Sequence, residues 1–230
     1  MAMRLRYEFK QAADGALNIY LYSDVEPAYI DWWTGERYDE GSAEHFRELL
    51  DGYPNAQRIN LFVNSNGGDV KEGYGIYAQL QRHPARKVAY VDGIAASIAS
   101  VICCACDEVV MYRNSMMFIH NMGCGVWGNA ADLRREADTL DKMMEGNRQI
   151  YLAKAGDKLT EEQLIEMLDK ETWLTAIEAQ SFGLCDTIVD AAYEPHTPAQ
   201  EQAMQRMFQL YKQPAKEPPK KERIFKFTNL

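Results

Sequence analysis

The chain has 230 residues, 47% of them hydrophobic, which is enough for one large domain or for one domain with appendages. Its formal net charge of −9 and its pI of about 5.0 argue against nucleic acid or an anionic membrane as the main partner. We expect neither a membrane span nor a signal peptide, because no run is long and apolar enough and the N-terminus leads into polar residues.

The five cysteines point to a reducing compartment. Cys103, Cys104 and Cys106 lie in one apolar segment, where they resemble small hydrophobic residues. An odd number of cysteines, with helical neighbours that cannot easily bridge, favours a cytoplasmic protein without disulfides. Cys103 and Cys106 form a C-x-x-C pair, but no second pair or histidine cluster supports a zinc site, so we expect no metal.

The N-terminal part of the chain predicts two strands and an aromatic loop. Alternating hydrophobic residues over 5–9 and 16–22 predict a hairpin that turns at Gly15. The next loop carries Trp32 and Trp33, which we interpret as packing or interface groups rather than as a ligand site.

The middle of the chain repeats the order strand, turn and helix. Ser42 can cap a helix that runs to Leu50. A strand over 58–64 leads through a glycine turn into a helix over 70–82, which Pro84 ends. Because the same order begins again after Pro84, we expect an α/β fold with parallel strands and covering helices.

Ser97 lies at the next junction between a strand and a helix. The strand over 86–91 is expected to break at Gly93, and small residues then lead into the buried apolar segment 101–105. The amides of a first helical turn have no helical partner and can hold negative charge that develops beside a serine hydroxyl. Ser97 is therefore a candidate nucleophile, although the G-x-S-x-G pattern is absent. The alternative is a helix N-cap or a small packing residue.

Gly67 and Gly68 follow the strand over 58–64 directly. Glycine permits a positive φ and a close approach to a ligand, so the N–H groups of this turn are candidates for half of an oxyanion hole. The alternative is an ordinary tight turn between strand and helix. Both this turn and the Ser97 turn lie at carboxyl ends of parallel strands, where α/β folds place their chemistry.

His120 is the best candidate for the base that would serve Ser97. It ends an apolar strand predicted over 116–121, 23 residues after Ser97, and the alternative is a histidine with a structural role. No apolar strand delivers the other three histidines, which are His45, His83 and His196.

The C-terminal half predicts one long helix and several short elements. Gly123–Gly128 is a glycine-rich segment that can serve as a mobile substrate-binding strand or lid, and Asn129 opens a helix over 130–155 that could pack between subunits. Shorter elements follow: a helix capped at Thr160, a strand within 169–175, a helix over 176–182 and a strand over 185–189. The proline-, glutamine- and lysine-rich tail 193–230 is interpreted as a partly disordered appendage to a domain over 1–192.

Several short runs together resemble one family. They are Asn64-Ser65-Asn66-Gly67-Gly68-Asp69-Val70, Asp92-Gly93-Ile94-Ala95-Ala96-Ser97, Met117-Phe118-Ile119-His120-Asn121, Glu171-Thr172-Trp173-Leu174-Thr175-Ala176, Glu178-Ala179 and Gly183-Leu184-Cys185-Asp186. In order and spacing, from about Ile19 to Val189, the chain resembles the Clp protease proteolytic subunit (ClpP) family of ring-forming serine peptidases. The particular residues in these runs look most like those of the phage and prophage branch, whose members are head maturation or prohead proteases.

The resemblance implies roles for individual residues. Ser97 matches the nucleophile, His120 the general base, and Glu171 the third triad member, which is usually an aspartate; Asp169 is a less favoured substitute. The amides of Gly68, with Gly67 as an option, and Ile98 match the oxyanion hole. Residues 122–128, with Gly123, Cys124 and Gly125, match the strand that pairs with substrate, and residues 129–155 match the handle helix between stacked rings.

The resemblance also implies the fold and the function. It implies a crotonase-like fold of repeated β-β-α units, heptameric rings stacked in pairs, peptide substrates and no cofactor. The first hypothesis is a phage-type protease that trims scaffold and capsid proteins without an ATPase. The alternatives are a housekeeping protease fed by a Clp-type ATPase and a structural ring that has lost catalysis. A crotonase-type acyl-CoA enzyme would not need the Ser97–His120 pair.

Overall fold

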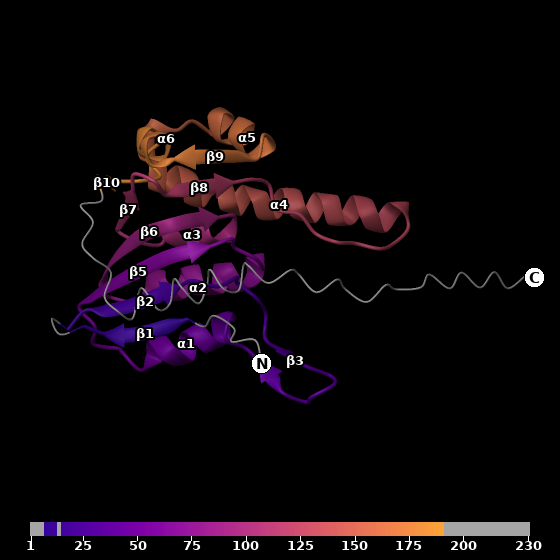
Figure 1. The fold of residues 1–230 in the computed structure, drawn as a ribbon. Coiled ribbons are helices and arrows are strands. Elements are labelled where there is room, and N and C mark those ends of the chain that lie inside the picture. The colour runs from indigo at the N-terminus through magenta and orange to yellow at the C-terminus, as the bar shows by residue number, and fades with distance from the viewer. Residues whose placement is uncertain (1–6, 13–14, 191–230) are drawn as a thin grey trace, which may run out of the picture. The chain divides into compact units, whose positions relative to one another are not determined.

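An eight-stranded, mostly parallel sheet forms the centre of the structure (Figure 1). The computed structural model describes residues 7–12 and 15–190. The strand order is β1 (Glu8–Gln11), β2 (Leu17–Leu21), β5 (Arg58–Ser65), β6 (Arg86–Ala96), β7 (Glu108–Tyr112) and β10 (Thr187–Val189), with β8 (Met116–Ile119) and β9 (Thr172–Thr175) joined beside β6. The β1–β2 and β8–β9 pairs are antiparallel and the other pairs of this sheet are parallel, which confirms the predicted α/β class.

Strand β6 is longer than predicted and belongs to two pairings. Its first half, Val88–Val91, pairs with β7, and its second half, Ile94–Ala96, pairs with β8. The expectation that Gly93 breaks the strand is wrong. A Cβ on Gly93 would lie 2.6 Å from Asn64 Oδ1, and this same oxygen accepts a hydrogen bond from the Ile94 amide at 3.2 Å. Gly93 therefore makes room for the Asn64 side chain of the neighbouring strand and does not end its own strand.

Helices cover the sheet, and all except the helix after Ser97 and a short 3₁₀ turn start where the sequence predicts. They are α1 (Ala43–Asp51), α2 (Val70–Arg82), α3 (Ile98–Cys103), α4 (Ala130–Ala155), a short 3₁₀ turn η1 (Gly156–Lys158), α5 (Glu161–Asp169) and α6 (Ala176–Ser181). The side chains of Ser42, Asn129 and Thr160 each accept hydrogen bonds from the first turn of α1, α4 and α5, so these predicted caps are confirmed.

The two faces of the sheet differ in what they carry. The alternating residues Ile59, Leu61 and Val63 of β5 are fully buried in the core, which also contains the apolar side chains of α3. On the opposite face, the half-buried rings of Tyr20, Phe62 and Tyr90 stack in a row across β2, β5 and β6. The centroids of adjacent rings are 4.8 and 5.1 Å apart.

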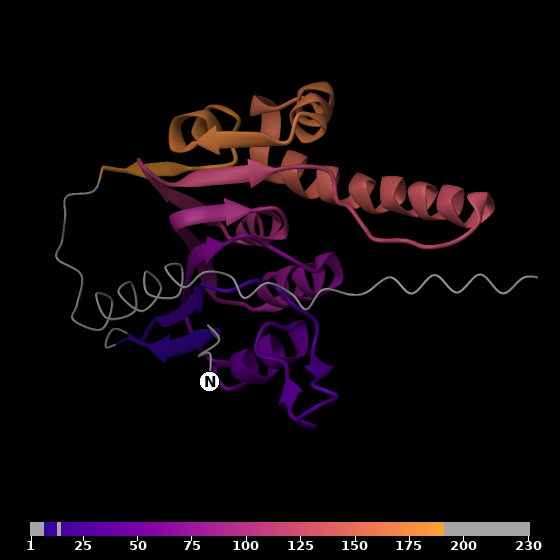
Figure 2. The same ribbon diagram turned by 45° about the vertical axis from the view of Figure 1, so that its right-hand side comes forward.

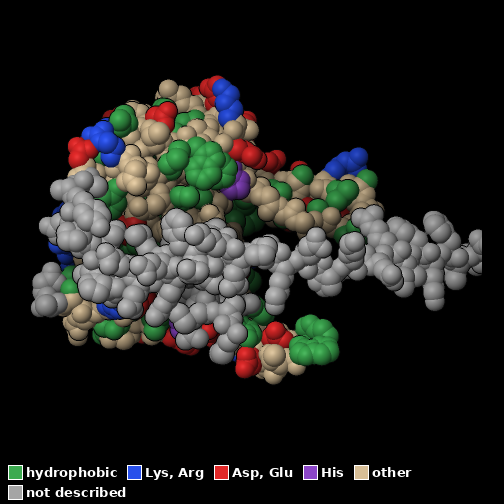
Figure 3. Space-filling model, in the orientation of Figure 1, with side chains coloured by type: hydrophobic (Ala, Val, Ile, Leu, Met, Phe, Trp, Pro, Cys, Tyr) green, Lys and Arg blue, Asp and Glu red, His purple; other side chains and the backbone are tan. Residues whose placement is uncertain are grey.

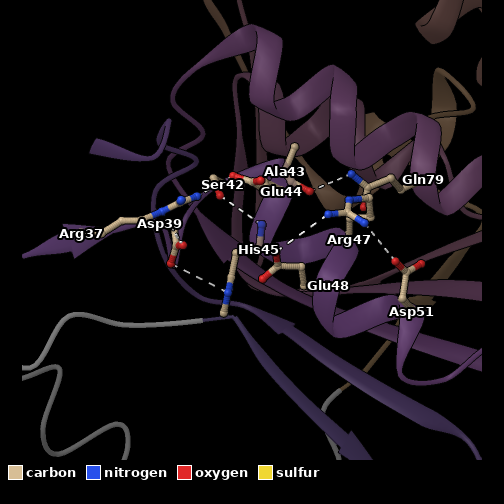
Figure 4. A network of polar contacts seen from close by, with 10 residues as sticks. All are labelled: Arg37, Asp39, Ser42, Ala43, Glu44, His45, Arg47, Glu48, Asp51 and Gln79. Carbon is tan, nitrogen blue, oxygen red and sulfur yellow. Dashed lines mark hydrogen bonds and ion pairs between the residues drawn. The ribbon is translucent and has the colours of Figure 1, made fainter. Parts of the chain in front are cut away.

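Polar contacts tie α1 to its surroundings (Figure 4). Arg37 forms ion pairs with Asp39 and Glu44, and the Gln79 side chain of α2 donates a hydrogen bond to the Ala43 carbonyl at 2.8 Å. These contacts fix the first turn of α1 against α2 and against the segment that precedes it.

A small hairpin carries the two tryptophans of the predicted loop. It is formed by β3 (Tyr29–Ile30) and β4 (Arg37–Tyr38). Trp32 and Trp33 are 85% and 77% exposed and contact each other edge to face, with ring centroids 5.1 Å apart. Figure 3 shows hydrophobic side chains gathered at the tip of this hairpin.

Helix α4 extends beyond the sheet in both ribbon views (Figures 1 and 2). Its buried residues, Met144, Asn147, Tyr151 and Ala155, all lie in its second half. Within the described ranges, no helix is long and apolar enough to cross a membrane. The predicted appendage over 193–230 lies outside the described residues.

A matched pair of glycine substitutions tests the packing of α2 against α3. A Cβ on Gly73 would lie 2.0 Å from Ile98 Cγ1, whereas a Cβ on Gly146 in α4 meets only the Tyr74 hydroxyl, at 3.8 Å. We expect Gly73→Ala to lower the free energy of unfolding by about 1–3 kcal/mol through overpacking. Gly146→Ala should raise it by about 0.5–1 kcal/mol because alanine favours the helix. Urea denaturation measures both, and equal effects of the two substitutions would contradict the observed contact.

Candidate active site

Ser97 occupies the tight turn between β6 and α3 in a strained backbone conformation. Its φ of 54° and ψ of −129° are unusual for a residue with a side chain. The surrounding backbone holds it there, because the Ser97 amide donates to the Phe118 carbonyl at 2.8 Å. Ser97 takes the N-cap position, but its side chain makes no capping hydrogen bond. The hydroxyl is therefore available for another contact.

A chain of buried hydrogen bonds connects the Ser97 turn to helix α4. The Ser97 carbonyl accepts a hydrogen bond from the Ser100 hydroxyl at 2.6 Å, and Ser100 Oγ lies 2.7 Å from the Tyr151 hydroxyl of α4. Burial raises the pKa of the Tyr151 hydroxyl far above its usual range, so this group stays protonated. The chain thereby connects the long helix to the turn that carries Ser97. The sequence offered no signal for this contact.

His120 contacts the Ser97 hydroxyl directly. His120 follows the end of β8, and its Nε2 lies 2.8 Å from Ser97 Oγ. The two side chains named from the sequence as candidate nucleophile and base are therefore in contact. The other described histidines have different partners: His45 lies 4.0 Å from Asp39, and the His83 ring contacts the Tyr53 carbonyl. His196 lies outside the described residues.

The two acidic residues predicted near His120, Glu171 and Asp169, do not bond to its side chain. Extending the β8–β9 register by one pair past Ile119 and Thr172 puts Glu171 opposite His120. Glu171 is exposed and has a φ of 51°, and across residues 7–12 and 15–190 no carboxylate forms a hydrogen bond or ion pair with His120. The Asp169 carboxylate instead accepts a hydrogen bond from Asn121 Nδ2 at 2.7 Å. The third member of the triad stays a prediction.

Gly67 and Gly68 bring the β5–α2 turn against the Ser97 turn. A Cβ on Gly67 would lie 2.6 Å from the Ala96 carbonyl and 2.8 Å from Ser97 Cβ, and the φ of 89° also favours glycine. Gly68 has a φ of 141° and lies against Val25, whose amide and carbonyl bond to the residues on either side of it. Both glycines are thus required by close backbone contacts.

The amides of this region differ in their availability. The Gly67 amide donates to Ser65 Oγ at 3.1 Å. Among the described residues, neither the Gly68 amide nor the Ile98 amide has a hydrogen-bond acceptor. An N–H group without a partner beside a nucleophile is the feature that an oxyanion hole requires. The assignment of Gly68 and Ile98 to that role stays a prediction, and Gly67 is the weaker option.

The glycine-rich segment after His120 forms no strand. Residues 120–129 have no regular secondary structure, and Trp127 is 99% exposed. A strand needs a neighbouring strand for its hydrogen bonds, and the described residues provide none here. Cys124 contacts Glu136 of α4, with 3.7 Å between Sγ and Oε1. The predicted substrate-binding role of Gly123, Cys124 and Gly125 stays a prediction.

Burial keeps four of the cysteines in the unreactive thiol form. Cys103, Cys104, Cys106 and Cys185 are buried and free. Burial raises the pKa of the Cys104 and Cys106 thiols to about 12. The described residues contain no group of three or more His, Cys, Asp or Glu side chains that could hold a metal ion.

Together, these features define a class of protein. A serine hydroxyl hydrogen-bonded to a histidine, with unpartnered amides at the carboxyl edge of parallel strands, is the arrangement of a serine-type hydrolase. Comparison with known proteins narrows the class, because the sequence profile of the Clp protease family matches residues 34–192. The chain belongs to the Clp protease family.

Three relatives show how far the similarity extends. The chain is 32% identical over 145 residues to "ATP-dependent Clp protease proteolytic subunit 3" of Rhodococcus jostii (strain RHA1), covering 61% of this chain and 71% of the relative. It is 29% identical over 187 residues to subunit 1 of Chlamydia abortus (strain DSM 27085 / S26/3), covering 77% and 96%. It is 30% identical over 184 residues to subunit 1 of Protochlamydia amoebophila (strain UWE25), covering 74% and 86%.

Alkylation of Cys124 tests where the glycine-rich segment lies. Partial desolvation and, next, the Glu136 carboxylate raise the pKa of the Cys124 thiol, which reduces the thiolate available at pH 8. We expect iodoacetamide to modify Cys124 before the four buried cysteines, and Glu136→Gln to increase the rate by about twofold. Glu145→Gln removes the same charge from an exposed site on α4 and is the matched control. Mass spectrometry measures the rate of Cys124 alkylation. Equal alkylation rates in the two variants would contradict the Cys124–Glu136 contact.

Proposed function

We propose that this chain is a serine endopeptidase in which Ser97 is the nucleophile and His120 the general base. The 2.8 Å contact between His120 Nε2 and Ser97 Oγ carries the proposal. The unprotonated Nε2 takes the Ser97 proton while Oγ forms a bond to the peptide carbonyl carbon. The carbonyl oxygen then becomes an oxyanion, for which the Gly68 and Ile98 amides are the proposed donors.

The same two side chains complete the reaction. His120 returns its proton to the amine as the carbon–nitrogen bond breaks, which leaves an acyl group on Ser97. Water then attacks the acyl carbon and passes a proton to Nε2. Nε2 returns this proton to Oγ as the bond between the acyl carbon and Oγ breaks, which releases the acid product and restores the Ser97 hydroxyl. The proposed site uses no cofactor or metal. Membership of the Clp protease family supports the peptide substrate.

Enclosure is proposed to restrict the substrate. We place the active sites inside a chamber of heptameric rings stacked in pairs, built on a crotonase-like fold, with α4 as the handle helix. The projection of α4 beyond the sheet supports the handle role (Figures 1 and 2). Trp127, which lies before α4, and Leu133, near the start of α4, are exposed and are suited to contacts between copies. We also propose that the protein is located in the bacterial cytoplasm.

A protease fed by a Clp-type ATPase is the better supported biological role. The relatives above are named as ATP-dependent subunits. The stacked row Tyr20, Phe62 and Tyr90 gives one sheet face half-buried aromatic surface, the kind of surface that hydrophobic loops of an unfoldase would need. The alternative role, phage head maturation with capsid or scaffold substrates, is supported only by the particular residues of the sequence motifs. An inactive structural ring remains as the third candidate.

Covalent labelling tests the proposed pair. A fluorophosphonate probe should modify Ser97 in the wild-type protein, and Ser97→Ala should abolish the adduct that mass spectrometry locates. His120→Ala should slow labelling by about 10²-fold or more, because the base no longer activates the hydroxyl. Ser181→Ala, on the surface of α6, is the control and should label normally. A correctly folded wild-type protein without an adduct would support the inactive ring instead.

Paired carboxylate variants test the third triad member. We expect Glu171→Gln to lower the labelling rate by about tenfold or more, because the imidazolium formed at His120 loses its stabilising charge. Asp169→Asn removes a carboxylate two residues away whose partner is Asn121, and it should change the rate by less than about threefold. The reverse order of effects would assign the role to Asp169.

A further inference from the structure

The His120 ring belongs to a stack of three aromatic rings. Its plane lies 21° from that of Phe118, with centroids 5.1 Å apart, and Phe118 stacks in turn on Trp173 at 4.5 Å and 27°. The face of the molecule in Figure 3 shows hydrophobic side chains gathered beside a histidine over β8 and β9. Trp173, the outer ring of the stack, is exposed, so the stack reaches the surface of the molecule.

Strand geometry explains why these rings meet. Side chains alternate along β8, so Met117 and Ile119 are fully buried in the core while Phe118 and His120 share the other face. Phe118 is directly paired with Trp173 across the β8–β9 ladder. Phe118 stacks on both other rings and so lies between them, whereas Trp173, at the outer end of the stack, is 47% exposed.

The surrounding charges do not hold the imidazole in place. Asp169 ends α5, and Lys170 and Glu171 form the turn that leads to β9. Asp169 accepts a hydrogen bond from Asn121, and Lys170 pairs with Glu166. In the part of the chain that the structure describes, the one polar partner of His120 is the Ser97 hydroxyl. A single hydrogen bond leaves the ring free to rotate about that bond, whereas contact with a flat aromatic face restricts its plane.

We propose that Phe118, braced by Trp173, is a positioning residue that holds the plane of the His120 ring toward Ser97 and stabilises its protonated form. An aromatic face is electron-rich, and it attracts the positive charge that the imidazole acquires when it takes the Ser97 proton. This proposal rests on the proposed function, because it assigns Phe118 a role through the base.

Saturation kinetics with a fluorophosphonate probe test the proposal on the full chain. The maximal rate of adduct formation reports bond formation at Ser97, and the half-saturating probe concentration reports binding. We expect Phe118→Leu, which keeps apolar bulk but removes the ring, to lower the maximal rate by about tenfold. The half-saturating concentration should change by less than about twofold. Phe118→Tyr should restore the rate to within about twofold of the wild type, because it restores the aromatic face.

Two further variants separate positioning from folding. Trp173→Leu removes the outer ring and should lower the maximal rate by about threefold, since Phe118 still contacts His120. Phe9→Leu makes the same substitution in β1, at the opposite edge of the sheet, where Phe9 stacks on Tyr53. It should lower the melting temperature without changing the labelling rate. If Phe118→Leu fails to fold, Trp173→Leu and Phe118→Tyr still test the ordering of rates.

Each outcome bears on a different claim. Wild-type labelling of Ser97 that is lost in His120→Ala, together with an unchanged rate in Phe118→Leu, would overturn the positioning role and leave the proposed function standing. A rate loss that Phe118→Tyr does not restore, or one that appears equally in Phe9→Leu, would also overturn it. Absence of wild-type labelling would overturn both proposals.

Discussion

The left-handed backbone of Ser97 is the constraint on which the rest of the structure depends. A φ of 54° is costly for a serine, and it persists because the residue is fixed on several sides. The Phe118 carbonyl holds its amide, the Ser100 hydroxyl holds its carbonyl, and Gly67 packs against its Cβ at a distance that only glycine permits. Strain of this kind leaves the hydroxyl pointing out of the turn, where His120 meets it.

The division of β6 between two partners explains how the histidine arrives there. The first half of β6 pairs with β7 and the second half with β8, so β8 ends beside the turn that follows β6. The antiparallel β9 then brings Trp173 over Phe118, and Phe118 over His120. The sheet thus places Ser97 and His120, the proposed nucleophile and base, by backbone pairing. In our proposal, the stacked aromatic rings then restrict the plane of the His120 ring.

Much of this could be predicted from the sequence, because the informative signals were local. Hydrophobic periodicity and capping residues predict α2 and α4 with their observed bounds, and the 23-residue spacing between Ser97 and His120 is consistent with their contact. The expectation for Gly93 is wrong because a glycine that accommodates a neighbouring side chain cannot be distinguished, from the sequence alone, from a glycine that ends a strand. The Ser100–Tyr151 contact spans 51 residues and has no local pattern. Phe118 was discoverable, since it lies two residues before His120 on the same strand face.

The most direct test of the central claim is a crystal structure of the fluorophosphonate adduct. If Ser97 is the nucleophile of a working peptidase, the probe's phosphorus will be bonded to Ser97 Oγ, with one phosphoryl oxygen about 3 Å from the amides of both Gly68 and Ile98. His120 Nε2 will remain within hydrogen-bond distance of the adduct. An adduct whose phosphoryl oxygen points to solvent, away from both amides, would contradict the assignment of this turn as the catalytic centre.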